Sequence, residues 1–308
     1  MNRTMSCSSP NLLRYSFLQE FSKSVFVVIC VVDAAIFFSA SFGNILILIS
    51  LRKSQAIHSP SKALFSSLAL SDLAVGLIVA PLHFGLTLGI VQDNPSLYCT
   101  FFAPTTAAGY TMASVSTLTA VAIALDRYLA FRLRVRYRQL VTVNRVVLFL
   151  SLVWIIGIMF ALSWTLDRNI SHIVAACATF LCTSTTFFCY LKIFVGLSHQ
   201  AARIQEQNQV RVARAIHRHF NIPVYRKSVK NMFLIYCVIL ICYVPYFLAL
   251  MLLFSVGLNS STFLVVSLSY VIIILNSSLN PFVYCWRIRE IRRHVLSILN
   301  DIYSMWTS

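Results

Sequence analysis

The chain has 308 residues, of which 58% are hydrophobic and only 11% are charged. Soluble domains carry about 25% charged residues, so this composition excludes an ordinary soluble protein and favours an integral membrane protein. The formal net charge of +16 would suit a nucleic-acid-binding protein. The basic residues lie mainly between apolar runs, however, and we therefore expect a lipid bilayer and no nucleic acid as partner.

The predicted elements are apolar runs long enough to cross a bilayer, which takes ~20 helical residues. Residues 1–23 are polar and lack the apolar core of a signal peptide, so we expect an extracellular N-terminal tail. The predicted seven-transmembrane domain, 24–285, follows. Its runs are 24–51, 62–90, 98–126, 145–165, 172–197, 229–257 and 262–285.

Residues 286–308 are too charged to span a bilayer. Their apolar residues, among them Ile291 and Val295, recur at helical spacing, which predicts a short amphipathic helix on the membrane surface and a short cytoplasmic tail. The predicted fold class is therefore an all-α membrane protein, a seven-transmembrane helix bundle with an amphipathic surface helix.

The positions of Lys and Arg predict the orientation. With the N-terminus outside, four of the 25 basic residues lie on the outer side and the other 21 on the inner side. Because inner loops are enriched in Lys and Arg, we expect a multi-pass plasma-membrane protein with an extracellular N-terminus. Three Asn-X-Ser/Thr sequons fall on the outer side and are candidate glycosylation sites. These are Asn2, Asn169 and Asn259.

Polar and ionisable side chains form stripes within the apolar runs. On three runs, two such residues lie eleven positions apart, which is close to three full helical turns. The pairs are Asp33 with Asn44, Asp72 with His83, and Ser116 with Arg127. Ionisable groups at membrane depth usually face the bundle interior and have a function. The alternative is that they only hold neighbouring helices together by hydrogen bonds.

Asp72 lies in the middle of an apolar run without an adjacent Lys or Arg. Such a carboxyl group must be protonated or neutralised by a cation. Ser116, Asn276, Ser277 and Asn280 carry neutral oxygens of the kind that small hard cations prefer. We therefore expect an allosteric sodium ion at these five residues, and no other cofactor.

Short motifs follow one another along the runs, one in almost every run. They are Gly43-Asn44, Leu70-Ser71-Asp72-Leu73, Asp126-Arg127-Tyr128, Trp154, Tyr190, Cys242-Tyr243-Val244-Pro245 and Asn280-Pro281-Phe282-Val283-Tyr284. In this order they resemble the motifs of rhodopsin-like (class A) G-protein-coupled receptors, over roughly residues 25–298. A very short second outer loop without cysteine, and Cys182 in place of the usual helix-five proline, resemble the melanocortin branch. Asn280 does not, since melanocortin receptors usually have Asp there, and the chain is therefore described as melanocortin/adenosine-like.

The resemblance implies a receptor that binds an extracellular ligand and activates a heterotrimeric G protein. Helix six would swing outward around Pro245, and Arg127 would be freed to contact the G protein. Sodium at Asp72 would favour the inactive packing. The residues with implied roles in activation and coupling are Asp126, Arg127, Tyr128, Val135, Tyr190, Tyr243, Pro245, Asn280, Pro281 and Tyr284, and Asn44 and Trp154 have implied structural roles.

Two departures from the family pattern lead to further predictions. The acidic helix-six residue that often holds the arginine is missing, since Tyr225, Arg226 and Lys227 occupy that region. Raised basal signalling is expected as a result. The common disulfide to the second outer loop is also absent, and the resemblance suggests a Cys7–Cys99 disulfide in its place.

The ligand is not identified by the sequence. Residues 107–110 contain no acid to hold an amine, and residues 262–285 contain no Lys for attachment of retinal. Asp33 and His83 could pair with each other or hold a basic ligand group. In adenosine receptors the comparable acid has a helix-seven histidine as partner, where this chain has Ile274. The pocket candidates are Asp33, His83, Tyr110, Ala113, Tyr246, Phe247 and Tyr270.

Other classes fit less well. A seven-helix decoy or scavenger receptor would bind ligand without activating a G protein, and the intact Asp126-Arg127-Tyr128 motif argues against it. A transporter would more often show paired broken helices or inverted repeats. An enzyme is not expected, because we find no nucleophile–base pair and no metal cluster.

Overall fold

The computed structural model describes the backbone of residues 9–55, 57–133, 136–166, 168–211, 222–287 and 289–307. Within these ranges, the side chains of 9–10, 165–169, 200–237, 239, 287 and 306–307 are not described. All regular secondary structure in the described ranges is helical. The elements are α1 Ser9–Gln19, α2 Lys23–Lys53, α3 Ser59–Ala74, η1 Val75–Val79, α4 Ala80–Val91, α5 Pro95–Leu133, α6 Tyr137–Leu140, α7 Val143–Leu166, α8 Arg168–Arg211, α9 Ile222–Val256, α10 Ser260–Arg287 and α11 Arg289–Thr307.

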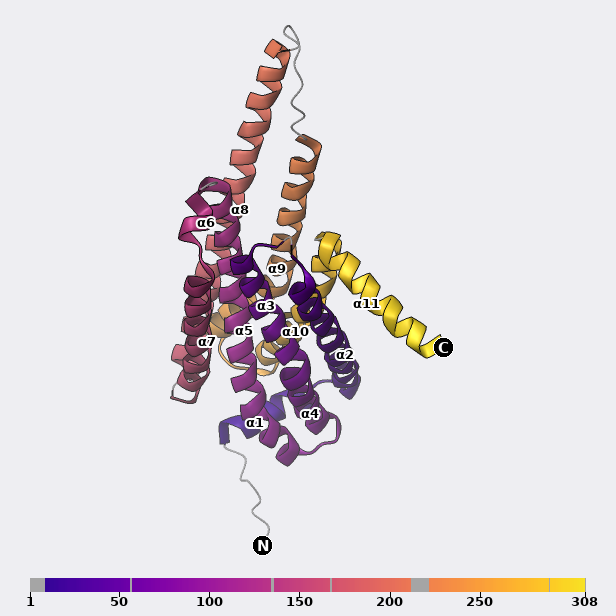
Figure 1. Cartoon of the computed structure of the whole chain (residues 1–308). Coiled ribbons are helices and arrows are strands. Elements are labelled where there is room, and N and C mark those ends of the chain that lie inside the picture. Colours follow the sequence, from indigo (N-terminus) through magenta and orange to yellow (C-terminus); the bar gives the residue numbers. More distant parts are fainter. Residues whose placement is uncertain are drawn as a thin grey trace.

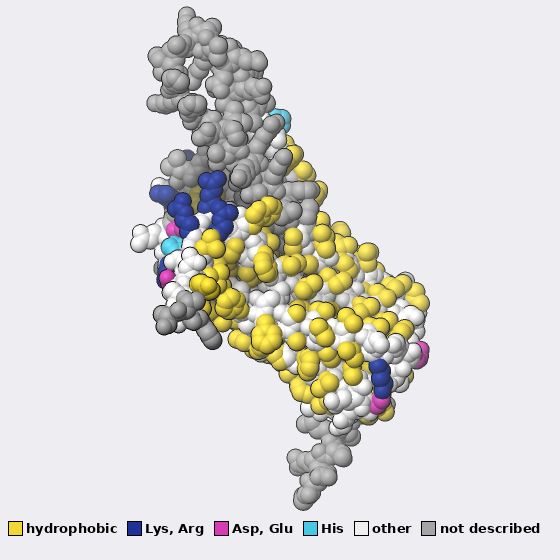
Figure 2. Space-filling model, turned by 90° about the vertical axis from the view of Figure 1, so that its right-hand side faces the viewer, with side chains coloured by type: hydrophobic (Ala, Val, Ile, Leu, Met, Phe, Trp, Pro, Cys, Tyr) yellow, Lys and Arg dark blue, Asp and Glu magenta, His cyan; other side chains and the backbone are white. Residues whose placement is uncertain are grey.

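Long apolar helices make up the bundle (Figure 1). Six described segments are long and apolar enough to cross a membrane, and a shorter apolar segment of α9, Leu240–Val256, joins them. Figure 2 shows hydrophobic side chains over the middle of one face, with Lys and Arg gathered toward one end. The predicted all-α membrane bundle is confirmed. Most spans agree with the predicted runs within three residues. The span in α5 extends seven residues past the predicted end at 126, and the α9 segment is preceded by side chains that are not described.

One span is built from three elements. α3, η1 and α4 run together from Ser59 to Val91, with a π-helical turn in the middle. Pro81 follows that turn in the first turn of α4 and has no N–H for the usual helical hydrogen bond. The π turn lies between Asp72 and His83, so the simple eleven-residue spacing does not describe this helix. Both side chains are nonetheless buried.

The two ends of the bundle differ. α1 lies at the end formed by α4 and the start of α5, which we call the α1 end, and α6 lies at the opposite end, the α6 end (Figure 1). α11 packs its fully buried Ile291, together with Val295, against a cluster that includes Leu46 of α2. The predicted amphipathic helix is therefore present. The helix α1 within residues 1–23 was not predicted.

α2 and α10 pack closely at Gly43. A Cβ atom at this position would lie 2.7 Å from Cγ and 2.9 Å from Cβ of Pro281. The proline ring cannot rotate away, so a larger residue forces the two helices apart.

We expect Gly43→Ala to destabilise the receptor by ~1–3 kcal/mol, the usual cost of overpacking. The measurement is the melting temperature of the purified protein in detergent. Val31→Ala is the control, because Val31 on the same helix is 65% exposed toward the membrane side. An unchanged melting temperature for Gly43→Ala would show that the contact is not a close one.

Candidate functional site

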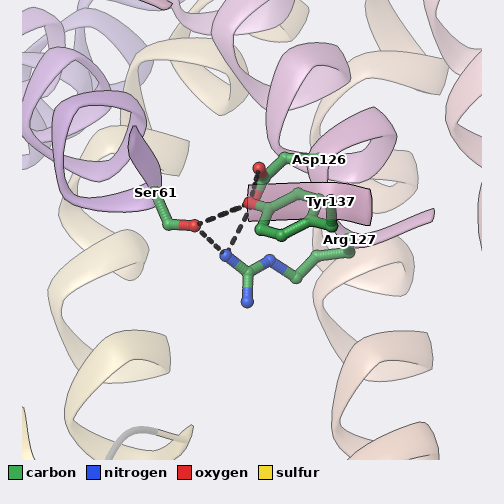
Figure 3. A network of polar contacts seen from close by, with 4 residues as sticks. All are labelled: Ser61, Asp126, Arg127 and Tyr137. Carbon is green, nitrogen blue, oxygen red and sulfur yellow. Dashed lines mark hydrogen bonds and ion pairs between the residues drawn. The ribbon is translucent and has the colours of Figure 1, made fainter. Parts of the chain in front are cut away.

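A polar cluster joins three elements at the α6 end (Figure 3). Nη2 of Arg127 donates to Oδ2 of Asp126 at 2.6 Å and to Oγ of Ser61, on α3, at 2.5 Å. Oη of Tyr137, on α6, donates to Oδ1 of Asp126 at 2.5 Å. Asp126 is buried, whereas the Arg127 side chain is 28% exposed. The arginine is thus held against its own helix at the rim of the bundle.

Tyr137 is suited to its role as a donor. Burial and its hydrogen bond to Asp126 both raise the pKa of Tyr137, so the phenol stays protonated at neutral pH and donates to the carboxylate. Ser61 also donates from Oγ to Oδ2 of Asp126, at 3.0 Å. Asp126 therefore accepts hydrogen bonds from two further elements besides its ion pair with Arg127.

Sequence reasoning missed Ser61 and Tyr137, and it placed Tyr128 in the same motif as Arg127. The Tyr128 hydroxyl accepts a hydrogen bond from Arg132 at 3.2 Å instead of joining the cluster. Val135, expected to contact the G protein, lies outside the described residues. Arg127 also lies over the ring of Phe65 at 5.7 Å.

A second polar cluster surrounds Asp72 in the middle of the bundle. Asp72 is fully buried. Its Oδ1 accepts from Oγ of Ser116 at 3.3 Å, and its Oδ2 accepts from Nδ2 of Asn280 at 2.6 Å. The Ser277 side chain is close enough to interact with this carboxylate. Oδ1 of Asn276 is buried and has no hydrogen-bond partner among the described residues.

These residues come from α3, α5 and α10. Asp72 interacts with Ser116, Ser277 and Asn280, and Asn276 lines a cavity together with Ser116 and Asn280. A small cavity of about 10 Å³ adjoins them and is lined in part by Ser116 and Ser277. A buried carboxylate, two hydroxyls and an unsatisfied amide oxygen form a donor set that fits a small hard cation. Asn280 differs from the expectation, because its amide nitrogen, not its oxygen, faces Asp72.

A further cavity of about 60 Å³ lies between the two clusters. Tyr190, Tyr243 and Tyr284 line it, together with Asn276 and Asn280. Tyr190 and Tyr284 both have implied roles in activation, and this cavity provides space next to both rings.

The two predicted structural residues both join helices. Nδ2 of Asn44 donates to the carbonyl oxygens of Ala40 at 2.9 Å and of Ser277 at 3.1 Å. Nε1 of Trp154 donates to Oγ of Ser67 at 3.3 Å. Pro245 lies inside α9, and Pro281 inside α10.

The third feature is a cavity at the α1 end, with about 140 Å³ of space that the centre of a water molecule can reach. Four predicted pocket residues line it: His83, Tyr110, Tyr246 and Tyr270. Oη of Tyr110 hydrogen-bonds to Nδ1 of His172 at 3.0 Å and lies 3.4 Å from Oη of Tyr246.

Asp33 and His83 pair with each other. Nδ1 of His83 lies 2.8 Å from Oδ2 of Asp33, and the Asp33 side chain is fully buried. The histidine faces the cavity, and the acid lies behind it. The paired arrangement, one of the two that the sequence allowed, is the one observed.

Besides Asp33, two predicted pocket residues do not line this cavity. Ala113 lines the small cavity beside Asp72, one layer deeper in the bundle. Phe247 stacks on Phe180 of α8, with ring centroids 6.3 Å apart. Helical spacing predicted their depth but not the direction in which they point. The cavity also includes Arg14 and Trp164, which sequence reasoning missed.

The structure describes only some of the residues predicted to form a disulfide or to carry glycans. Cys99 forms a disulfide, and Cys7, its predicted partner, lies outside the described residues. Asn2 and the side chain of Asn169 also lie outside them. Asn259 is half-buried, and its Oδ1 accepts the backbone N–H of Thr262 at 3.0 Å, at the start of α10. The glycosylation sites remain predictions.

Comparison with known proteins identifies the family. The chain matches the family model described as "7 transmembrane receptor (rhodopsin family)" over residues 43–284. The chain belongs to this receptor family. The match runs from the Gly43-Asn44 motif to Tyr284. Because the chain belongs to this family, it is a multi-pass membrane receptor and not an enzyme.

Among individual relatives, the receptor is 27% identical to sheep (Ovis aries) adenosine receptor A3 over 286 residues, 87% of this chain and 88% of that protein. It is 26% identical to mouse (Mus musculus) adenosine receptor A2b over 313 residues, 89% of each chain. Rat (Rattus norvegicus) adenosine receptor A2b is 34% identical over 158 residues, 50% of this chain and 45% of that protein. These similarities agree with the adenosine-like part of the expected melanocortin/adenosine-like resemblance.

Proposed function

We propose that this receptor binds an extracellular ligand in the cavity at the α1 end and activates a heterotrimeric G protein at the α6 end. The N-terminus and α1 are then extracellular, residues 24–285 form the receptor domain, and α11 lies along the cytoplasmic surface of the plasma membrane. The basic residues support this orientation, since 21 of 25 fall on the cytoplasmic side.

The main support for G-protein activation is the cluster of Arg127, Asp126, Ser61 and Tyr137. It holds a partly exposed cation at the cytoplasmic rim through contacts that a helix movement can break. A ligand acts by stabilising one of two packings, and the released arginine is then available to the G protein. The cavity lined by Tyr190 and Tyr284 provides space for that rearrangement.

The test is a signalling screen in cells that express the receptor at measured surface levels. Each G-protein class is co-expressed with a reporter, and a ligand panel that includes adenosine is applied. We expect at least one class to respond above mock-transfected cells. Ligand binding without a response from any class would instead identify a decoy receptor.

We also propose that sodium binds at Asp72 and stabilises the inactive packing. The support is the buried carboxylate with Ser116 and Ser277 beside it, and the unsatisfied Oδ1 of Asn276. The ion would neutralise Asp72, which has no Lys or Arg within hydrogen-bond reach in the described part of the chain.

Sodium is therefore expected to raise the melting temperature of the purified receptor relative to choline at equal ionic strength, and Asp72→Asn is expected to remove this difference. Binding of an ion to the folded state alone stabilises it by mass action. Asp33→Asn is the matched control, because Asp33 is the other fully buried mid-membrane acid and is paired with His83. A sodium effect that survives in Asp72→Asn would contradict the site.

A further inference from the structure

Two of the cavities lie at successive depths in the bundle and share a wall. The ligand cavity at the α1 end is the outer one, and the small cavity of about 10 Å³ beside Asp72 is the inner one. Among the described residues, Tyr270 of α10 is the one that lines both. A direct route from the ligand cavity to Asp72 therefore passes this side chain.

The neighbouring helices show that Tyr270 lies at the boundary between the two cavities. On α5, Thr105 lines the outer cavity, and Gly109, about one helical turn deeper, lines the inner one. On the facing span, His83 of α4 lines the outer cavity, and Val79 of η1 lines the inner one. The boundary runs between the two members of each pair.

The Tyr270 side chain extends from α10 to α5 at this boundary. Its Oη donates to the carbonyl oxygen of Thr105 at 3.4 Å. A Cβ atom on Gly109 would lie only 2.0 Å from the same Oη, so the hydroxyl lies directly against the backbone of α5. The centre of the Tyr270 ring lies 5.2 Å from that of His83. The side chain thus separates the cavities, and it can do so because residue 109 is a glycine.

The contacts that hold the Tyr270 ring in this position are weak enough to break. Its hydrogen bond to Thr105 is longer than the usual 2.5–3.0 Å or so between two oxygens. The side chain is only partly buried. The outer cavity, with about 140 Å³ of space that the centre of a water molecule can reach, lies next to the ring. Rotation of the ring into that space would join the two cavities.

We propose that Tyr270 is a gate that controls the passage of water and small cations between the ligand cavity and Asp72. In the structure the gate is closed, because the ring separates the two cavities. A ligand that fills the outer cavity contacts the same ring and restricts its rotation, so ligand binding also controls exchange at Asp72. This inference rests on the proposed function, since it assigns a regulated entry route to the sodium site.

The test is the rate at which a thiol in the inner cavity reacts with a small cationic reagent. Ala113 lines the inner cavity and not the outer one, so Ala113→Cys reports on the inner cavity. Ser267 lines the outer cavity alone, so Ser267→Cys reports whether the reagent arrives there. The reagent is aminoethyl methanethiosulfonate, applied to purified full-length receptor in nanodiscs. Peptide mass spectrometry separates either site from the nine native cysteines.

Tyr270→Ala is expected to speed the reaction of Ala113→Cys about tenfold or more and to leave that of Ser267→Cys unchanged. With an intact gate the inner thiol reacts only in the open fraction of molecules, and minor conformations are typically populated at roughly 0.1–10%. Phe263→Ala is the matched control, because it removes an aromatic ring from the same helix that lines the outer cavity alone.

A second variant opens the gate while keeping the tyrosine. Gly109→Ala places a Cβ atom 2.0 Å from Oη of Tyr270, so the ring must move, and we expect faster reaction of Ala113→Cys. Adding Tyr270→Phe removes the clashing hydroxyl and leaves ring carbons at 2.9 Å and 3.1 Å, which need a much smaller shift. The double variant is therefore expected to react more slowly than Gly109→Ala alone, which a general loosening of the bundle does not explain.

Equal rates for Ala113→Cys with and without Tyr270→Ala would overturn the gate. So would equal acceleration by Phe263→Ala, or a rate for Ala113→Cys in the otherwise unchanged receptor that matches that of Ser267→Cys. The melting temperature verifies that each variant is folded. The thiol reaction needs neither bound sodium nor a G protein. A failure of the gate is therefore distinguishable from a failure of the sodium site, which is tested by melting temperature in sodium and choline, and from a failure of G-protein activation.

Discussion

Asp126→Asn is expected to raise ligand-independent G-protein activation several-fold above the wild-type level. The carboxylate of Asp126 holds Arg127 at 2.6 Å and accepts from Tyr137 and Ser61. Removing its charge loses a charge-assisted contact worth ~1.5–3 kcal/mol, which shifts an inactive–active equilibrium by roughly tenfold or more. The measurement is basal signalling in cells, normalised to receptor at the surface.

The contribution of the second and third elements is tested by Tyr137→Phe and Ser61→Ala. Each removes one hydroxyl from the cluster, and we expect a smaller rise in basal signalling than for Asp126→Asn. Ser151→Ala is the control, since its hydroxyl is exposed on α7 and bonds only to its own helix, at Val147. Basal signalling at or below the wild-type level in Asp126→Asn would show that the cluster does not hold the inactive state.

The cluster also changes an expectation from the sequence. Raised basal signalling was expected because helix six lacks an acid to hold the arginine, which left Asp126 as the only evident partner. Ser61 and Tyr137 are two further residues that fix the same group. The side chains of Tyr225, Arg226 and Lys227 lie outside the described residues. High basal activity stays a prediction, and the cluster is expected to limit it.

Arg127→Gln is expected to reduce G-protein activation to the level of cells without the receptor. Gln keeps a hydrogen-bond donor but loses the cation and the reach of the guanidinium, so it cannot replace the contact with the G protein. Surface expression and ligand binding should remain, because Arg127 lies at the opposite end from the ligand cavity. The measurement is G-protein activation in the same surface-normalised assay, with Arg127→Lys expected to keep a small part of it.

Arg145→Gln is the matched control for that variant. Arg145 is an exposed arginine that hydrogen-bonds only to the carbonyl of Leu140 in the described structure, and the proposed orientation places it on the cytoplasmic side. A second variant, Asp126→Asn/Arg127→Gln, removes the buried charge that Arg127→Gln leaves without its partner. G-protein activation at the wild-type level by Arg127→Gln or by Asp126→Asn/Arg127→Gln would refute a direct role for this arginine.

The membrane spans and the polar interior followed from the sequence because their causes are local. Apolar run length gives the spans. Helical periodicity and the rarity of polar residues at membrane depth predicted that Asp72, Ser116 and Asn276 share the bundle interior. All three side chains are buried in the structure, and Ser116 donates a hydrogen bond to the Asp72 carboxylate.

Other features of the fold and of the site could not be predicted, because they depend on contacts between residues that are distant in the sequence or on local changes in helix geometry. The inward face of α1 mixes Asn11, Arg14 and Leu18, so its apolar signal is too weak to identify it before its neighbours are known. Ser61 and Tyr137 meet Asp126 from two other elements, 65 and 11 positions away along the chain. The π turn η1 changes the register between Asp72 and His83, which spacing arguments assume to be regular.

The most direct test of the receptor assignment is nucleotide exchange on purified G-protein trimers, one from each class, by the purified receptor in nanodiscs. We predict that the wild-type receptor accelerates exchange on at least one trimer, that Asp126→Asn accelerates it further, and that Arg127→Gln does not accelerate it. Exchange rates for folded wild-type and Asp126→Asn receptors that equal those with empty nanodiscs, on every trimer, would contradict the account.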